Sequence, residues 1–389
     1  MSAQHPLIAT WARSAVVPRH GAFKTLQTHE LAAPVIHALL AKTGIQPHAV
    51  DAIVMGNALG AGGNPARMLA LHANLDTQTA AYTVDTQCCA GLDAVALGAA
   101  LIASGQAHVV IAGGAEAWSR SPLRMHRPLT SDAPAVAFER PAFAPTAEQD
   151  PDMLLSAARY AAHTGYTRIQ QEAYAAQSHT RALAYQAAMR DEIVPILSVT
   201  HDVYPRHIDP ARAARMPVVA RSDAAHTDDS CALSALTISA QADAAAFVLL
   251  VSPQACATLQ LTPKLQWTAH ASVGCRPETP LLAAQAAALQ ALQHAGFTHA
   301  SDFAHVELHD AFAVQGLSFM QNLAIDPERL NTHGGGLSRG HPIGASAAIA
   351  LVRLLSDLTS SPKAHAKGLV AVAGAGGLGS AAVLTSLVP

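Results

Sequence analysis

The sequence predicts an α/β fold made of two duplicated halves, with a long insertion inside the first half. Three observations lead to this prediction. Apolar, strand-like segments alternate with alanine-rich helical segments, one plan of elements occurs twice, and the stretch 119–243 differs in composition from both copies. Alternating strands and helices are typical of mostly parallel sheets that are covered by helices.

The repeated plan is a helix, a glycine stop, a short loop and an apolar strand. It runs over residues 37–57 and again over residues 289–310. Gly44 and Gly296 end the two helices and lie 252 positions apart. Glycine is common at this place because it adopts the left-handed backbone conformation without steric cost. The shared offset favours a duplication, although sequence repeats usually have shorter periods.

A second pair of elements follows each strand: a glycine-bearing loop with an alanine-rich helix, and then another strand. The second strands lie within 108–116 and 368–379. Cys88 and His341 stand where the two equivalent helices begin, 253 positions apart. Because α/β folds bind ligands at the ends of their strands, we expect the two helix starts to meet at one central site.

The insertion is rich in Pro, Arg, His and Asp and contains one clear amphipathic helix over 168–192. We expect it to form a loop domain over the site; the alternative is a surface excursion that binds nothing. The predicted division is a first half of residues 1–118 with 244–266, an inserted domain of 119–243, and a second half of 267–389.

Composition narrows the class of protein. Charged residues make up 13% of the chain, about half the usual share, so we expect a homo-oligomer that hides apolar surface between subunits. A net charge of −3 gives no sign of nucleic-acid binding. Five irregularly spaced cysteines, without a Cys-x-x-Cys pair, argue against a disulfide framework and against a metal site.

The apolar runs fall short of the ~20 residues that a membrane span needs, and we read no signal peptide at the start. We therefore expect a soluble, cytoplasmic protein.

Three residues carry the chemistry that the sequence suggests. Cys88, in DTQCCAG, precedes a helix whose unpaired N–H groups and dipole favour a thiolate. His341, in GGGLSRGHPIGAS, lies at a loop-to-helix junction and could act as the base for a neighbouring thiol. His309, at the end of the apolar strand in VELHDAFA, could donate a hydrogen bond to a thioester oxygen. Taken singly, a buried cysteine, a plain glycine-rich loop and a structural histidine explain each motif equally well.

Together, the motifs resemble those of the thiolase family. VDTQCCAGLDA (84–94), AGGAEAWSRSP (112–122), VELHDAFAVQ (306–315), GGGLSRGHPIGAS (334–346) and GAGGLGSA (374–381) occur in the family's order over nearly the whole chain. The resemblance implies a five-layered α-β-α-β-α fold and an acyl-CoA C-acyltransferase that makes or cleaves 3-ketoacyl-CoA. It also implies CoA thioesters as substrates, no further cofactor, and a homodimer or homotetramer.

The resemblance also assigns roles to single residues. It implies that Cys88 is acylated, that His341 activates it and that His309 helps to form an oxyanion hole. Arg206, in YPRH, matches a place where thiolases meet the adenine-nucleotide end of CoA, and Ser239 falls near a serine that contacts pantetheine. Successive helical residues point about 100° apart, so we expect Cys89 to pack in the interior and Cys88 to react.

The sequence departs from the family at the second catalytic cysteine, which moves the α-proton of the second substrate. Ala373 stands in its usual place, and Ala311 stands where a subgroup with His-Asp-Cys-Phe carries it. Three functions remain open. The protein is a thiolase in which another group or water moves the proton, a decarboxylating condensing enzyme with a Cys-His-His set, or a thiolase-like protein that only binds or hydrolyses acyl-CoA. We take the first as the main hypothesis.

Overall fold

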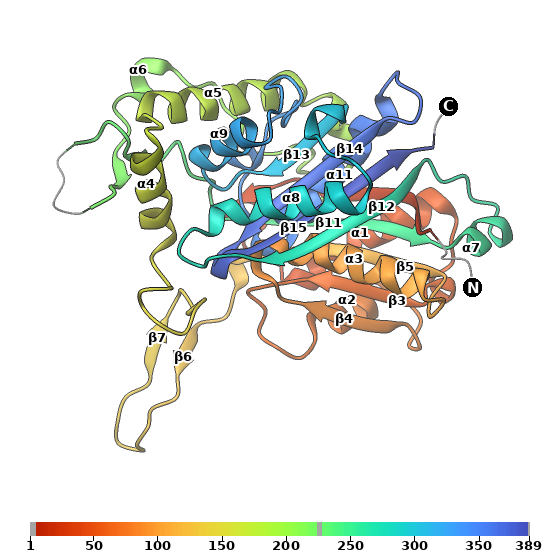
Figure 1. Cartoon of the computed structure of the whole chain (residues 1–389). Helices are drawn as coiled ribbons and strands as arrows, with labels where there is room; N and C mark the ends of the chain where they lie inside the picture. Colours follow the sequence, from red (N-terminus) through yellow and green to blue (C-terminus); the bar gives the residue numbers. More distant parts are fainter. Residues whose placement is uncertain (1–4, 224–227, 388–389) are drawn as a thin grey trace.

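Helices and sheets alternate in five layers, α-β-α-β-α, in this computed structural model, which describes residues 5–223 and 228–387 (Figure 1). The layering confirms the predicted fold class. The two sheets belong to the two halves of the chain. They are joined at one edge, where Leu7 and Ile8 pair with Gln266 and Leu265.

The sheet of the first half has the strand order β4-β3-β5-β11-β1. Its three strands β4, β3 and β5 are parallel, whereas β11 and β1 run antiparallel to their neighbours. The strands are β1 (Leu7–Ser14), β3 (Ala52–Gly56), β4 (Ala80–Val84), β5 (Val109–Ala117) and β11 (Ala242–Val251). Helices α1 (Thr28–Thr43) and α2 (Pro65–His72) cover its outer face, and the short β2 (Val17–Pro18) and α7 (Pro253–Thr258) flank β11.

The sheet of the second half repeats this arrangement in the order β13-β14-β15-β12. Again the first pair is parallel and the next two pairs are antiparallel, and Leu330 pairs with Val306 where β4 would stand. The strands are β12 (Leu265–Gly274), β13 (His305–His309), β14 (Lys367–Gly374) and β15 (Leu378–Ser386), with α8 (Ala283–His294) and α9 (Ala313–Asn322) outside. The duplication is therefore visible in the hydrogen bonding. Residues 265 and 266 belong to β12, so the second half begins slightly before the predicted boundary at 267.

Two helices, α3 (Ala90–Ala103) and α11 (Ser346–Ser360), form the central layer and contact both sheets. A helix that is apolar on all sides is typical of such a buried position. The segment 343–360 has the length and composition of a membrane span, but 78% of it is buried inside the protein. Its apolar character is thus explained by the core.

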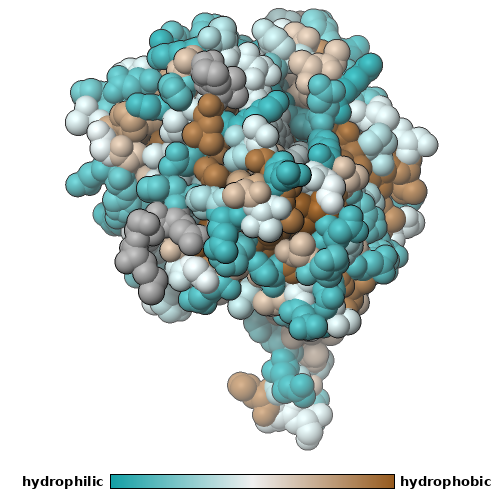
Figure 2. Space-filling model, turned by 90° about the vertical axis from the view of Figure 1, so that its right-hand side faces the viewer, coloured by the Kyte–Doolittle hydropathy of each residue, from teal (hydrophilic) through white to brown (hydrophobic). Residues whose placement is uncertain are grey.

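In its described residues, 119–223 and 228–243, the insertion contributes three α-helices and five short strands. They are α4 (Met153–Thr164), α5 (Arg168–Ala184) and α6 (Pro210–Ala213), with β6 (Arg124–His126), β7 (Val136–Phe138), β8 (Ile193–Val194), β9 (Val218–Ala220) and β10 (Leu233–Ser234). The hairpin β6–β7 forms an arm that stands out from the body in two views (Figures 1 and 2). The helix predicted over 168–192 begins at Arg168 as expected but ends at Ala184. Residues 188–191 form a separate 3-10 turn, and Ile193 and Val194 then pair with β1.

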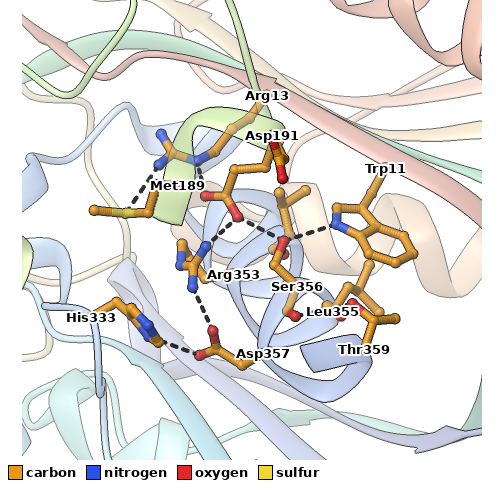
Figure 3. Close-up of polar contacts among 12 residues, drawn as sticks. Trp11, Arg13, Met189, Asp191, His333, Arg353, Leu355, Ser356, Asp357 and Thr359 are labelled. Atoms are coloured by element: carbon orange, nitrogen blue, oxygen red, sulfur yellow. Dashed lines mark hydrogen bonds and ion pairs between the residues drawn. The ribbon is translucent and has the colours of Figure 1, made fainter. Parts of the chain in front are cut away.

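A buried ionic cluster ties the insertion to both halves (Figure 3). Arg13 of β1 binds Glu192 at 2.7 Å and Asp202 at 2.7 Å, and Arg353 of α11 binds Glu192 and Asp357. Burial raises the pKa of Glu192, but the guanidinium groups of Arg353 and Arg13 outweigh it and hold that pKa below its ordinary value. The inserted segment is therefore fixed to the central layer by paired charges.

Candidate active site

The nucleophile candidate lies in a tight turn between β4 and α3. Gln87 adopts a left-handed backbone conformation with φ 55°, and the Asp85 carboxylate accepts a hydrogen bond from its backbone N–H at 3.1 Å. A single turn of 3-10 helix, Gln87–Cys89, follows and leads into α3 at Ala90. Cys88 therefore lies just before the α-helix, close to the predicted helix start. Non-glycine residues with positive φ are uncommon and tend to cluster at functional sites.

The loop that carries His341 is fixed on both sides of the imidazole. Before it, the short helix α10 (Gly336–Arg339) ends at Gly340, whose φ is 117°. The His341 backbone N–H donates to the Ala240 carbonyl at 2.6 Å. After it, Pro342 and a 3-10 turn, Ile343–Ala345, lead into α11 at Ser346. His341 thus lies five residues before the helix that it was predicted to open.

Cys88 and His341 meet, as their equivalent positions in the two halves predict. Cys88 Sγ lies 3.2 Å from His341 Nε2. His341 Nδ1 lies 2.8 Å from Ser346 Oγ, and that hydroxyl donates its own proton to the Pro342 carbonyl at 3.0 Å. Because the hydroxyl proton is already used, Ser346 accepts the proton of Nδ1, and this assignment leaves Nε2 free to accept a proton from Cys88.

The resting state of the pair differs from the prediction of a thiolate. Burial raises the pKa of Cys88 to about 12, although the backbone N–H groups of Ala375 and of Cys88 itself face the sulfur and favour its ionisation. Burial also lowers the pKa of His341 to about 4. Loss of hydration therefore outweighs the helix terminus, and the pair rests as a thiol and a neutral imidazole at pH 7.

His309 contacts the site through His341. Its Nε2 lies 2.6 Å from His341 Nδ1, and the two rings are stacked at a centroid distance of 4.6 Å. Burial, followed by the neighbouring His341 and Arg339, holds the pKa of His309 well below its ordinary value. The proton on His341 Nδ1 faces both Ser346 Oγ and His309 Nε2, so His309 Nε2 acts as its second acceptor. The predicted oxyanion-hole role would require this nitrogen to donate instead, and that role stays a prediction.

A second buried pair joins the segments that carry the two histidines. Glu307 precedes His309 by two residues, and Arg339 precedes His341 by two residues. Arg339 Nη2 lies 3.3 Å from Glu307 Oε2, and both side chains are almost fully buried. Burial raises the pKa of Glu307 to about 8, although the Arg339 guanidinium opposes that rise. Charged or neutral, this contact fixes the end of β13 against α10, and with it the spacing of the two imidazoles.

Cys89, Ala373 and Ala311 are the positions near the site that bear on a second catalytic thiol. Cys89 is 1% exposed, and its sulfur lies 3.9 Å from the Val372 carbonyl, under the site. Val372 pairs in register with His309, so Ala373 lies one residue beyond that pair. Ala373 and Ala311 are both partly exposed. Neither methyl group can accept a proton.

The two predicted CoA-binding residues lie in the insertion, in different surroundings. The Arg206 guanidinium lies over the Tyr204 ring at 4.4 Å and is partly exposed. The Ser239 hydroxyl donates to the Gly336 carbonyl at 2.6 Å, and its backbone N–H donates to the Ala311 carbonyl at 2.9 Å. Ser239 thus fixes the catalytic loop, whatever it contributes to ligand binding.

Sequence reasoning missed Glu116, which lies next to the catalytic loop. This residue is the last but one of the apolar strand β5 and is 1% exposed. A charged residue at the end of a strand of small apolar residues was the available signal. Within residues 5–223 and 228–387, no group of three or more His, Cys, Asp or Glu side chains could hold a metal ion.

Comparisons with known proteins find similarity over almost the whole chain. Residues 7–254 match the family model of the thiolase N-terminal domain, and residues 261–386 match that of the thiolase C-terminal domain. The chain is 35% identical to the acetyl-CoA acetyltransferase of Chromobacterium violaceum, over 95% of this chain and 96% of the relative. The crystal structure of the Bacillus anthracis acetyl-CoA acetyltransferase is similar over 100% of both chains, with a TM-score of 0.90 and 27% identity. The Acat5 thiolase from Ascaris suum, solved in complex with coenzyme A, is similar over 99% of this chain and 100% of that chain, with a TM-score of 0.89 and 25% identity.

Replacing His341 by alanine should slow the alkylation of Cys88 by iodoacetamide at neutral pH. The thiol rests protonated, so its reaction depends on the base, and loss of a general base should lower the rate by about tenfold or more. Peptide mapping by mass spectrometry measures the rate at Cys88. His294→Ala, on the outer helix α8, serves as the matched control. An equal alkylation rate in His341→Ala and wild type would contradict the role of His341.

Proposed function

Because the chain belongs to the thiolase family, we propose that it makes or cleaves 3-ketoacyl-CoA through an acyl group carried on Cys88. The observation that carries this proposal is the contact of 3.2 Å between Cys88 Sγ and His341 Nε2. A cysteine beside a neutral imidazole is a typical activated nucleophile. The enzyme class, an acyltransferase, follows from the family.

Acyl transfer follows from the positions of the protons. Cys88 Sγ attacks the thioester carbon and passes its proton to His341 Nε2. The departing CoA sulfur then takes that proton from Nε2, so the imidazole returns to its neutral form. While His341 is protonated, His309 Nε2 accepts from its Nδ1 at 2.6 Å and stabilises the positive charge. The backbone N–H groups of Cys88 and Ala375 face the sulfur, and we assign them as donors to the oxygen of the bound acyl group.

Formation of the carbon–carbon bond needs a carbanion on the second substrate. Ala373 and Ala311 leave the two usual positions without a thiol. In the thiolase reaction another group or water removes the α-proton. In the decarboxylating alternative, the bond to the carboxylate breaks, CO₂ leaves and its electron pair stays on the α-carbon, so no base is required. This alternative is favoured by the same two alanines.

CoA binding is proposed for the insertion. A cavity of about 360 Å³ opens there, lined by Asp152, Leu154, Leu155, Val218, Val219, Ala220 and Arg221. Leu154 also packs against the apolar cluster that includes Phe312, three residues after His309. Arg206 offers a partly exposed cation for the phosphates.

Incubation with acetyl-CoA should place one acetyl group on Cys88. Brief reaction, acid quenching and peptide mapping would locate it. Cys89→Ser keeps the nucleophile and changes the neighbouring sulfur, so it should be labelled like wild type, whereas Cys88→Ser should give no thioester. Acetylation of Cys89 in the Cys88→Ser variant would overturn the assignment of the nucleophile.

The second substrate separates the two condensation reactions. We expect the thiolase to cleave acetoacetyl-CoA with CoA and to gain little from malonyl-CoA over acetyl-CoA in synthesis. Free CoA and 3-ketoacyl-CoA are the products to measure. A preference for malonyl-CoA of about 10²-fold, the lower range for a missing general base, would instead identify the decarboxylating enzyme. Ala373→Cys is the informative variant, since a gain in thiolysis would show that the missing thiol limits the rate.

A second copy of the chain is the proposed partner of strand β4. This strand lies at the end of its sheet, and within the described residues its outer edge has no partner strand. Tyr82 on β4 is 48% exposed, and Met68, Leu71 and Leu97 on the flanking helices α2 and α3 are 45–50% exposed. An unpaired edge flanked by apolar side chains favours antiparallel pairing about a two-fold axis. The low charge content of 13% supports the same proposal.

Tyr82→Lys should convert this dimer to a monomer, because a lysine on an edge strand opposes pairing with another strand. Sedimentation velocity at micromolar concentration measures the mass. Leu289→Lys replaces an apolar side chain of similar exposure, 47%, on the outer helix α8 and serves as control. A monomeric wild type, or an unchanged mass of Tyr82→Lys, would contradict the proposed interface.

A further inference from the structure

We propose that Glu116 is a positioning residue of the active site, whose buried carboxylate holds the His341 loop within reach of Cys88. The inference rests on the proposed function only for the roles of Cys88 and His341. Glu116 itself contacts neither of these side chains in the hydrogen bonding of the described residues. It acts through the backbone of Gly344, three residues after His341.

Each carboxylate oxygen of Glu116 accepts two hydrogen bonds. Oε1 accepts from Asn57 Nδ2 at 2.8 Å and from the Leu59 N–H at 3.3 Å. Oε2 accepts from the Ala58 N–H at 3.0 Å and from the Gly344 N–H at 3.0 Å. One carboxylate therefore joins the loop after β3, in the first half, to the loop before α11, in the second half.

Gly344 lies in a narrow space where small shifts are transmitted. A Cβ atom on Gly114 would lie 2.0 Å from the Gly344 carbonyl oxygen, and one on Gly91 would lie 2.8 Å from it. On the other side, a Cβ on Gly344 itself would lie 2.7 Å from Asn57 Cα. Gly91 is three residues after Cys88, so the segments of the nucleophile and of the base cross here. Their contact sets the distance between Sγ and Nε2.

A carboxylate suits this place better than any neutral side chain. Burial raises the pKa of Glu116 to about 7, so the charged form is costly there, and the N–H donors of Ala58, Gly344 and Leu59 oppose that rise. Glutamine keeps the shape but has only one acceptor oxygen. Its NH₂ group would face two of the four donors, and buried donors that lose their acceptor weaken the contact.

The test is Glu116→Gln, measured by two readouts. Alkylation of Cys88 by iodoacetamide should slow by about tenfold, and kcat for acyl transfer should fall by roughly 10- to 100-fold with KM changed by less than about twofold. Asp51→Asn is the matched control. The Asp51 carboxylate accepts from the N–H groups of His108 and Val109 at 2.7 and 2.9 Å, at the opposite ends of β3 and β5. This control should alkylate like wild type.

A double-mutant cycle separates positioning from general damage. In a His341→Ala background, Glu116→Gln should cause no further loss of alkylation rate, because the residue to be positioned is gone. An equal loss in both backgrounds, or a wild-type rate in Glu116→Gln, would overturn the proposal. If circular dichroism shows that Glu116→Gln does not fold, Glu116→Asp, which keeps the charge and withdraws it by one methylene, takes its place in the same cycle.

The cycle does not depend on the substrate, since iodoacetamide reports on Cys88 directly. A wild type that reacts with no acyl-CoA would refute the proposed function, while the alkylation cycle would still decide the role of Glu116.

Discussion

The two halves of the molecule touch backbone to backbone, and the active site depends on that contact. A Cβ atom on Gly114 would lie only 2.0 Å from the Gly344 carbonyl oxygen. Any larger residue at Gly114 would push α11 and its preceding loop away from α3. Because packed interiors transmit such a shift, the imidazole would leave the thiol. The small residues of the two central helices therefore have a geometric purpose beyond filling the core.

The charged side chains of the interior also help to hold the catalytic residues at fixed distances. The catalytic pair is neutral at rest, since burial raises the pKa of Cys88 and lowers that of His341. Full charges occur instead in the cluster of Arg13 with Glu192 and Asp202, where the guanidinium groups hold the pKa of both carboxyl groups below their ordinary values. Buried pairs of this kind add little net stability but penalise displaced arrangements, because a separated partner is left as an unpaired buried charge.

Much of the fold could be read from the sequence because it is encoded in periodic and repeated patterns. The offset between Cys88 and His341 predicted their meeting, and the glycine stops located two outer helices. The ionisation state of Cys88 could not be read in this way, since it depends on how much water the folded site excludes. Glu116 was missed for a related reason. A single carboxylate has no spacing pattern, and its four donors come from segments more than 200 residues apart. The pairing of Ile193 and Val194 with β1, just after the segment predicted as helix, is likewise a contact that no local pattern contains.

The position of β1 has a consequence for how the chain is made. This first strand pairs with β11, β12 and β8, all of which come after residue 192. At a synthesis rate of about 5–20 residues per second, roughly 12 to 50 seconds pass between the synthesis of β1 and that of β11. Arg13 also lacks the carboxylates that neutralise it until residues 192 and 202 have been translated. An insertion placed inside the first half thus postpones the closure of its sheet. Strand β8 can pair with the end of β1 once about half of the chain has been translated, but the full pairing with β11 needs nearly two thirds of it.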